Sequence, residues 1–382
     1  MSRYRPRARW LLMGIALLTS VLMLAACETA TPLSTIAPEG SNAENIYSLL
    51  KPVAVAGLVV FVLVEGLLVY TVFRFRRRSQ AMPVQTHGNT RVEILWTIAP
   101  AIIVLVIAVL TFRTQAINSV QPPDALRIEV VGHQWWWEFK YPQQSIVTAN
   151  DVYIPVGRDV TFVLNSVDVI HSFWVPRLGG KTDVIPNNTN YLTYRANREG
   201  VYYGHCTEFC GEQHALMRMR LIAVAPEVFD RWVANQQTPP VKPAGEYVVP
   251  TAVRRTTPTP GVPTPTVAPT PTPFADPAAR GQVTFIRKGC VSCHVIGGVP
   301  QAKGLTGPNL TYLGSRTTLA AGTMPNTPEN LRLWLRDPGA IKPGNLMAAA
   351  IKPGVLSEQE ISDLVAYLEG MKLNNVPLPP ER

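Results

Sequence analysis

The segment His205-Cys206-Thr207-Glu208-Phe209-Cys210-Gly211-Glu212-Gln213-His214-Ala215-Leu216-Met217 places two thiols, an imidazole and a thioether in one short loop. This soft ligand set suits copper, because thiolate and thioether favour copper, imidazole also binds it, and a His/Cys site with a weak Met serves electron transfer. The two thiols lie four residues apart, and two bridging sulfurs can hold two metal ions. A binuclear centre then needs a second imidazole from elsewhere in the fold, for which His171 is the candidate.

Two other kinds of site use some of the same residues. Cys206 and Cys210 could form a disulfide in an exported protein, and a Cys-x-x-x-Cys pair with a histidine could bind zinc. Neither alternative requires Met217 or His171, whereas a copper centre uses both. The whole pattern therefore favours copper over a simple cysteine pair.

The pattern Cys-x-Glu-x-Cys-Gly-x-x-His-x-x-Met, with Asp168-Val169-Ile170-His171-Ser172 upstream, resembles the CuA site of cytochrome c oxidase subunit II. The resemblance covers nearly the whole chain. It implies a binuclear CuA centre whose ligands are His171, Cys206, Glu208, Cys210, His214 and Met217. Glu208 would bind copper through its backbone carbonyl, while its carboxylate would reach a magnesium ion at the interface with the catalytic subunit, subunit I.

Length, cysteines and charge set the outline of the molecule. A chain of 382 residues suggests two or three folded units. Its five cysteines all have an assignment, with Cys27 in an export signal, Cys206 and Cys210 in the copper loop, and Cys290 and Cys293 in a haem motif. The net charge of +9 includes four arginines in a segment expected to be removed on export, which leaves +5, so the charge gives no nucleic-acid signal.

Residues 1–26 have the pattern of a signal peptide, with a basic start followed by the apolar stretch from Trp10 to Ala26. Leu24-Ala25-Ala26-Cys27 resembles the lipobox of bacterial lipoproteins, in which cleavage precedes a cysteine that becomes lipidated. We therefore expect Cys27 to be the first residue of the mature chain and a candidate lipid anchor. The alternative is an uncleaved membrane helix with an incidental cysteine.

Two apolar spans follow an extracytoplasmic segment over residues 27–51. Val53 to Phe73 and Leu95 to Phe112 are each about long enough to cross a bilayer. The basic loop between them, Arg74 to Arg91, belongs in the cytoplasm by the positive-inside rule. Residues 52–118 are thus predicted to form a multi-pass hairpin in a bacterial cytoplasmic membrane, with both flanks on the extracytoplasmic face.

Two carboxylates lie in or beside these spans. Glu65 is within the first span, where a charge is costly and usually faces a protein partner rather than lipid. Glu93 starts the second span, in a segment similar to the one that precedes the second helix in the oxidase family. The resemblance implies that Glu93 lies at the mouth of a proton pathway, and an ordinary interfacial carboxylate is the alternative.

The sequence from residue 119 to residue 237 predicts an antiparallel β domain. Leu126, Ile128 and Val130 alternate with polar residues, and similar runs recur later, at Asp151 to Val156, Val160 to Asn165 and Met219 to Val224. Short strands separated by turns suggest a sandwich or a Greek-key barrel. The resemblance implies the cupredoxin fold, which agrees.

The run Gly132-His133-Gln134-Trp135-Trp136-Trp137-Glu138 contains three adjacent indoles, which cannot all enter one core from a strand. At least one is therefore expected to face outward. In the oxidase family the position matching Trp135 receives electrons near CuA. Core and membrane-interface packing is the alternative for Trp136 and Trp137.

From Thr238 to Pro273 the sequence is dominated by Pro and Thr and lacks the apolar periodicity of a core, so it predicts a semi-stiff tether. Residues 274–382 then carry Cys290-Val291-Ser292-Cys293-His294, in which two thiols can form thioethers to haem and the histidine can bind its iron. Helices are predicted for Ala275 to Lys288, Thr327 to Leu335 and Ser357 to Leu368, which matches a small class I cytochrome c.

The second axial ligand of this haem c should be a methionine downstream. Met347, in Ile341-Lys342-Pro343-Gly344-Asn345-Leu346-Met347, resembles the family's ligand loop. The family often has Pro after that Met, and here Ala348 follows, so Met324 in Thr323-Met324-Pro325 competes for the role.

The predicted fold class is multidomain, with a two-helix transmembrane hairpin, an all-β cupredoxin-like Greek-key barrel and an all-α cytochrome c domain. The resemblance implies the electron-input subunit of a caa-type cytochrome c oxidase, passing electrons from haem c to CuA and on to subunit I for proton-pumping oxygen reduction. Its partners would be subunit I, other membrane subunits, membrane lipid and a soluble or membrane-bound electron donor. The alternatives are the CuA subunit of a nitric oxide reductase and a free-standing membrane-anchored electron carrier, whereas a quinol oxidase subunit would lack the copper ligands.

Overall fold

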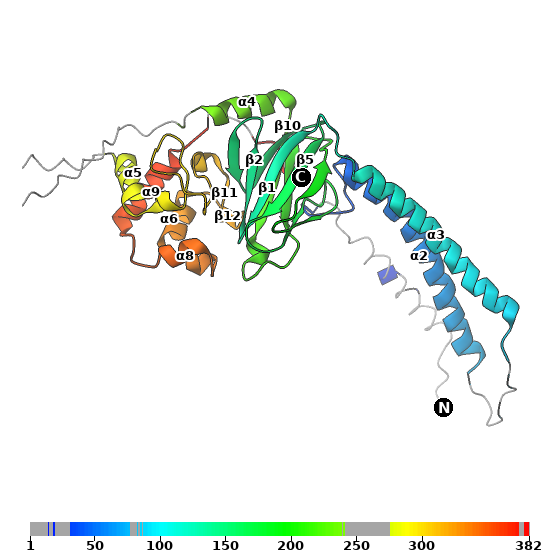
Figure 1. Cartoon of the computed structure of the whole chain (residues 1–382). Helices are drawn as coiled ribbons and strands as arrows, with labels where there is room; N and C mark the ends of the chain where they lie inside the picture. The colour runs from blue at the N-terminus through cyan, green and yellow to red at the C-terminus, as the bar shows by residue number, and fades with distance from the viewer. Residues whose placement is uncertain are drawn as a thin grey trace, which may run out of the picture.

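The computed structural model describes residues 14, 18, 19, 31–76, 82, 85, 87–238, 240, 276–373 and 378–381. The predicted lipidation site Cys27, most of the predicted signal peptide and nearly all of the predicted tether lie outside these residues. The described chain forms a pair of long helices, a β domain and a C-terminal helical domain, in that order (Figure 1).

Helices α2 (Ser41–Arg74) and α3 (Thr90–Asn118) lie side by side and are both long and apolar enough to cross a membrane (Figure 1). Both extend beyond the predicted spans on the side of the β domain. There the Asn45 amide donates to the Asn118 side-chain oxygen at 2.8 Å. Gly40, just before α2, forms a β-bridge with Ala196 of the β domain, so the helix pair is joined directly to that domain.

The β domain is a sandwich of two five-stranded sheets. The first has the order β3-β2-β1-β5-β8 and contains β1 (Leu126–His133), β2 (Trp136–Tyr141), β3 (Ile146–Ala149), β5 (Val160–Ser166) and β8 (Asn190–Tyr194). The second has the order β4-β10-β9-β6-β7 and contains β4 (Asp151–Pro155), β6 (His171–Trp174), β7 (Thr182–Val184), β9 (Gly200–Cys206) and β10 (Arg218–Val224). Helix α4 (Pro226–Gln237) follows the last of these strands.

Most neighbouring strands are antiparallel, as predicted, but β1 pairs with β5 and β4 pairs with β10 in parallel. These partners are far apart in the sequence and are not joined by a hairpin, so the chain can return in the same direction. The two sheets bury an aromatic core whose fully buried rings include Trp137, Phe139, Phe162 and Phe173. This core gives the loops at the ends of the strands a rigid base.

The C-terminal domain contains five α-helices among the described residues. They are α5 (Pro277–Arg287), α6 (Pro328–Arg336), α7 (Pro338–Ile341), α8 (Leu346–Ala350) and α9 (Glu358–Glu369), with a short ladder of β11 (Thr318–Leu319) and β12 (Met324–Pro325). Helices α5 and α9 cross closely at Gly281, where a Cβ would lie 2.0 Å from the Asp363 carbonyl oxygen. Arg280 forms an ion pair with the Asp363 carboxylate at 2.7 Å beside this crossing.

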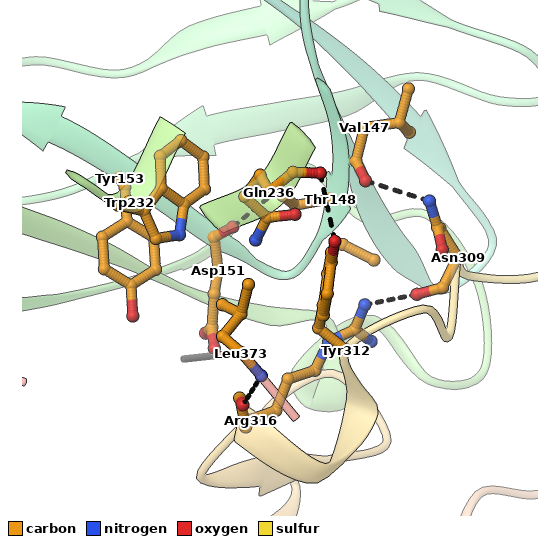
Figure 2. Close-up of a pocket in the computed structure, with 12 residues that line it drawn as sticks. Val147, Thr148, Asp151, Tyr153, Trp232, Gln236, Asn309, Tyr312, Arg316 and Leu373 are labelled. Carbon is orange, nitrogen blue, oxygen red and sulfur yellow. Dashed lines mark hydrogen bonds between the residues drawn. The ribbon is translucent and has the colours of Figure 1, made fainter. Parts of the chain in front are cut away.

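The C-terminal domain packs against the β domain through contacts at several places. Asn309 donates to the Val147 carbonyl at 3.1 Å, and the Tyr312 hydroxyl donates to the Gln236 carbonyl at 3.2 Å near the end of α4 (Figure 2). Near the end of the chain, the Pro380 carbonyl accepts a hydrogen bond from the Val201 amide in β9. The two domains therefore contact each other at several places along the β domain.

The same interface overturns one expectation about the tryptophan run. Trp135 and Trp136 are each 9% exposed and Trp137 is 0% exposed, so none of the three faces solvent. Trp137 enters the core of the sandwich, whereas Trp136 packs with Ala149 and with Ala321 of the C-terminal domain. The prediction of an outward-facing indole is wrong because the second domain covers that face.

Candidate metal centre and haem pocket

The copper ligands predicted from the sequence meet at one end of the second sheet. His171 is the first residue of β6 and Cys206 the last residue of β9, and these two strands are neighbours, with Phe173 opposite Cys206. The loop after β9 carries Cys210 and the short 3-10 turn His214–Leu216, and Met217 precedes β10. Two adjacent strands and one loop thus supply the whole set.

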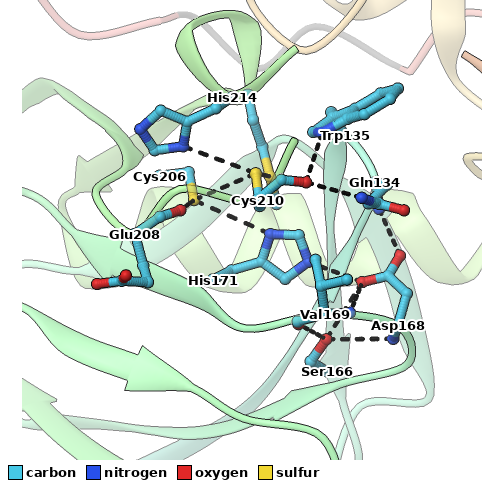
Figure 3. A network of polar contacts seen from close by, with 11 residues as sticks. Gln134, Trp135, Ser166, Asp168, Val169, His171, Cys206, Glu208, Cys210 and His214 are labelled. Atoms are coloured by element: carbon cyan, nitrogen blue, oxygen red, sulfur yellow. Dashed lines mark hydrogen bonds and ion pairs between the residues drawn. The ribbon is translucent and has the colours of Figure 1, made fainter. Parts of the chain in front are cut away.

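The distances within this set fit a compact cluster (Figure 3). The two sulfurs Cys206 Sγ and Cys210 Sγ are 3.8 Å apart, and His171 Nδ1 lies 3.9 Å from Cys206 Sγ. On the other side, His214 Nδ1 lies 3.6 Å and Met217 Sδ 3.8 Å from Cys210 Sγ. His171, Cys206 and Cys210 are buried and their ligand atoms all lie within 4.8 Å of one another.

The two thiols are free rather than bonded to each other, since their sulfurs are 3.8 Å apart and a disulfide bond is about 2.05 Å long. The hydrogen bond between them lowers the pKa of Cys206, because it stabilises a thiolate there. A thiolate next to a second sulfur and two imidazoles is a soft donor set of the kind that copper prefers. The residues present therefore fit a copper centre.

Asp168 fixes the ring of His171. Its carboxylate lies 2.8 Å from His171 Nε2 and accepts a hydrogen bond from the backbone N–H of Gln134 at 2.6 Å. Burial opposes protonation of His171, but the hydrogen bonds to Asp168 and Cys206 raise its pKa overall. With Nε2 held by the carboxylate, Nδ1 points to the sulfur cluster, which is the usual arrangement behind a metal-binding histidine.

Glu208 contributes its backbone to the cluster and its side chain to the surface. The Glu208 carbonyl lies 3.2 Å from Cys206 Sγ, and its carboxylate points away from the sulfurs and is exposed (Figure 3). Glu93 lies in the first turn of α3, far along the chain from this site, and is half-buried. Glu65 is exposed on α2.

A cavity of about 220 Å³ lies between the C-terminal domain and the β domain. The haem residues predicted from the sequence all line it, namely Cys290, Cys293, His294 and Met347. Met324, in β12, is not among the described residues that line this cavity, so the cavity favours Met347 over its competitor. Leu319, Leu331, Leu335 and Ile351 add apolar walls.

Two polar features match the cavity to a haem. His294 Nδ1 lies 2.8 Å from the Pro308 carbonyl, which fixes the ring and leaves Nε2 free to bind a metal. Burial lowers the pKa of His294, so the neutral form that binds iron is favoured. Burial also lowers the pKa of Arg316, another residue that lines the cavity, whose guanidinium donates to the Asn309 carbonyl (Figure 2). The sequence analysis did not single out Arg316.

Trp135 connects the cavity to the sulfur cluster. Its side chain lines the cavity, and its indole N–H donates to the Cys210 carbonyl at 3.0 Å. Gln134 donates to the same carbonyl through its side-chain amide at 2.7 Å. Gln134 also lines the cavity, so both residues lie between the two candidate cofactor sites.

Comparisons with known proteins match the helix pair, the β domain and the C-terminal domain separately. The family model for the cytochrome c oxidase subunit II transmembrane domain matches residues 38–114, the model for its periplasmic domain matches residues 143–224, and the model for cytochrome c matches residues 278–372. Cytochrome c oxidase subunit 2 of Alkalihalophilus pseudofirmus is 34% identical, over 92% of this chain and 94% of the relative. This chain belongs to the cytochrome c oxidase subunit II family.

Other subunit II proteins show the same likeness. Cytochrome c oxidase subunit 2 of Bacillus sp. strain PS3 is 34% identical, over 92% of this chain and 95% of the relative. The solved periplasmic domain of subunit II from Bradyrhizobium japonicum is 29% identical, covers 31% of this chain and 97% of that domain, and has a TM-score of 0.30.

Membership of the subunit II family confirms the predicted fold class and the presence of a fused cytochrome c domain. The chain is a component of an oxidoreductase, its periplasmic domain implies copper and its C-terminal domain implies haem. Two membrane-length helices and the matching transmembrane model indicate anchoring in a membrane with the β domain on the periplasmic side. Subunit II of a haem-copper oxidase normally pairs with subunit I.

Proposed function

We propose that this chain is the electron-input subunit of a caa-type cytochrome c oxidase, in which electrons pass from haem c to CuA and on to subunit I for proton-pumping oxygen reduction. One observation carries the proposal, namely that Trp135 lines the cavity that Cys290, Cys293 and His294 also line, and donates its indole N–H to the carbonyl of Cys210. When bound, the haem and the copper pair supply one-electron carriers on either side of this residue. Oxygen chemistry belongs to subunit I.

The chain's own residues have distinct roles in this proposal. His171, His214, Met217, the two thiols and the Glu208 carbonyl would hold the copper ions, with Asp168 orienting His171. Cys290 and Cys293 would each add across a haem vinyl group, sulfur to one carbon and hydrogen to the other, which consumes no oxidant. His294 and Met347 would be the axial ligands. Trp135 would receive electrons and stay shielded from water.

The remaining roles concern the membrane and its partners. The exposed Glu208 carboxylate would bind magnesium where the β domain meets subunit I, and Glu93 would lie at a proton-pathway mouth. Helices α2 and α3 would form a multi-pass hairpin in contact with lipid and subunit I, with a lipid anchor at Cys27. The electron donor would reduce the haem domain.

The deciding experiment is an electron paramagnetic resonance and optical spectrum of the full chain, purified with its membrane partners after copper loading and haem maturation. The expected result is a copper signal from an electron shared by two copper nuclei, beside a c-type haem spectrum. A mononuclear copper signal next to a normal haem would contradict the CuA assignment. Met347→Leu should change the haem spectrum, while Met324→Leu should not.

The alternatives predict different partners. If the chain belongs to a nitric oxide reductase, the catalytic subunit that co-purifies with it would have the sequence of a nitric oxide reductase. A free-standing carrier would purify without any multi-spanning subunit. Either outcome would leave both cofactor sites of this chain in place and would change only what receives the electrons.

A further inference from the structure

The side chain of Lys342 crosses from the C-terminal domain into the β domain. Its Nζ donates to the Trp135 carbonyl at 2.7 Å and to the Leu216 carbonyl at 2.9 Å, and a third carbonyl, that of Ala320, lies at 3.3 Å. Lys342 is 3% exposed, although lysine is almost never buried without a partner. An ammonium group has three N–H donors, and three carbonyls receive them.

Both carbonyls across the interface belong to the copper side of the molecule. Leu216 directly precedes the ligand Met217, and Trp135 donates its indole N–H to the Cys210 carbonyl. On its own side, Lys342 lies five residues before Met347 and also lines the haem cavity. One amine therefore ties the haem-ligand loop to the copper loop.

A second copy of the tetrapeptide that contains Lys342 provides a comparison for this contact. The tetrapeptide Ile-Lys-Pro-Gly occurs twice, at residues 341–344 and again at residues 351–354. Lys342 in the first copy is buried against the β domain, whereas Lys352 in the second copy is exposed. The local sequence is the same, so the burial of Lys342 comes from docking of the domain and not from the peptide itself.

Docking also covers the tryptophans. Trp135 and Trp136 are each 9% exposed with the C-terminal domain in place, and Ala321 of that domain packs on Trp136. The backbone continues the contact, because the Arg218 amide donates to the Ala321 carbonyl at 3.2 Å. A soluble protein cannot contact Trp135 while this interface is closed.

We propose that Lys342 is the positioning residue that holds the haem domain docked over Trp135, so that the copper site takes electrons from the chain's own haem domain and not directly from a soluble donor. The proposal rests on the proposed function for its electron-transfer part only. Lys342 has three carbonyl partners and, among the described residues, no ion-pair partner. Because each N–H must point at a carbonyl, these hydrogen bonds form only when the two domains are correctly placed relative to each other. A salt bridge between mobile side chains would fix the domains less well.

The test compares Lys342→Met with the matched variant Lys352→Met in the full chain purified with its membrane subunits. Burial lowers the pKa of Lys342 to about 7, so the measurements are made at pH 6, where the amine is protonated. Hydrogen–deuterium exchange of the peptide containing Arg218 reports docking directly. We expect faster exchange there in Lys342→Met, with unchanged exchange in α5 and α9, and no change in Lys352→Met.

Flash photolysis then measures transfer from the haem to the copper centre. Undocking should slow this intramolecular step by about tenfold or more, since a small misplacement of redox partners is costly. In Lys342→Met the rate of copper reduction should also include a component that increases in proportion to the concentration of an added reduced soluble cytochrome c. Lys352→Met should behave as the unmodified chain.

Three results would overturn the proposal. The first is that Arg218 in Lys342→Met exchanges its amide hydrogen as slowly as in the unmodified chain, and the second is that the rate of electron transfer from haem to copper is unchanged. The third is a loss of protection from exchange throughout α5 and α9, which would mean that Lys342 stabilises the fold of its own domain. A failure of the proposed function is distinguishable, because it would be a missing copper or haem signal in the unmodified chain. The exchange experiment needs neither signal.

Discussion

At the scale of single residues, the Asp168 carboxylate is the group whose removal most cleanly tests the metal centre. It accepts hydrogen bonds from His171 Nε2 and from the backbone N–H of Gln134, so it sets both the tautomer and the orientation of the His171 ring. Asp168→Asn should weaken copper binding by about 10- to 100-fold, the usual effect of removing a partner behind a metal-binding histidine. Competition with a copper chelator measures this.

Asp230→Asn is the matched control for that experiment, because Asp230 is an exposed carboxylate on α4, away from the cluster. Copper affinity should be unchanged in this variant. Equal losses in both variants would show that net charge, rather than the hydrogen bond to His171, controls binding.

Residues that act within one loop could be predicted from the sequence, and residues that act between domains could not. The spacing of Cys206, Cys210 and His214 is visible in the sequence, and the structure brings them together. The contacts of Lys342 join positions 207 and 126 residues apart, and no local pattern reports such a contact. The burial of Trp135 was missed for the same reason.

At the scale of elements, some strands could be located from the sequence and others could not. β1, β4, β5 and β10 were located within a few residues of their observed bounds. β2 was not located, because the run of three adjacent indoles interrupts the alternation at its start, although Trp137, Phe139 and Tyr141 alternate with Glu138 and Lys140 farther along. Helix α2 begins earlier than predicted because its first turns are fixed by the β domain and not by apolar composition.

The crossing of α5 and α9 gives the prediction that belongs to this scale. In Gly281→Ala the new Cβ would lie 2.0 Å from the Asp363 carbonyl oxygen, so the two helices must separate. We expect a loss of stability of about 1–3 kcal/mol, the range for overpacked cores. Thermal unfolding followed through the haem absorbance measures it.

Gly370→Ala is the comparison for that substitution, because Gly370 ends α9 with φ −70°, a conformation that alanine adopts readily. Its nearest contact is 3.3 Å away, so little movement is needed. Similar losses in the two variants would mean that the α5–α9 contact is more adaptable than its geometry implies.

At the scale of the whole molecule, one chain holds two redox domains whose interface combines several weak contacts. The Lys342 contacts, the Tyr312 hydroxyl near the end of α4 and the Pro380 carbonyl on β9 lie at different places on this interface. We expect these contacts to hold the domain only when its local concentration is high. The chain between residues 238 and 276 joins the two domains covalently, and such a connection raises the effective concentration of one domain at the other.

Cutting the tether therefore tests how the molecule works as a unit. A protease site inserted between residues 241 and 275 leaves both domains and their interface unchanged until cleavage. Before cleavage, transfer from haem to copper should not depend on dilution, because it is intramolecular. After cleavage the docked fraction should fall as the protein is diluted, so the rapid phase of flash photolysis should lose amplitude. A rapid phase that keeps its full amplitude at every dilution would show that the interface alone, without the tether, holds the haem domain in place.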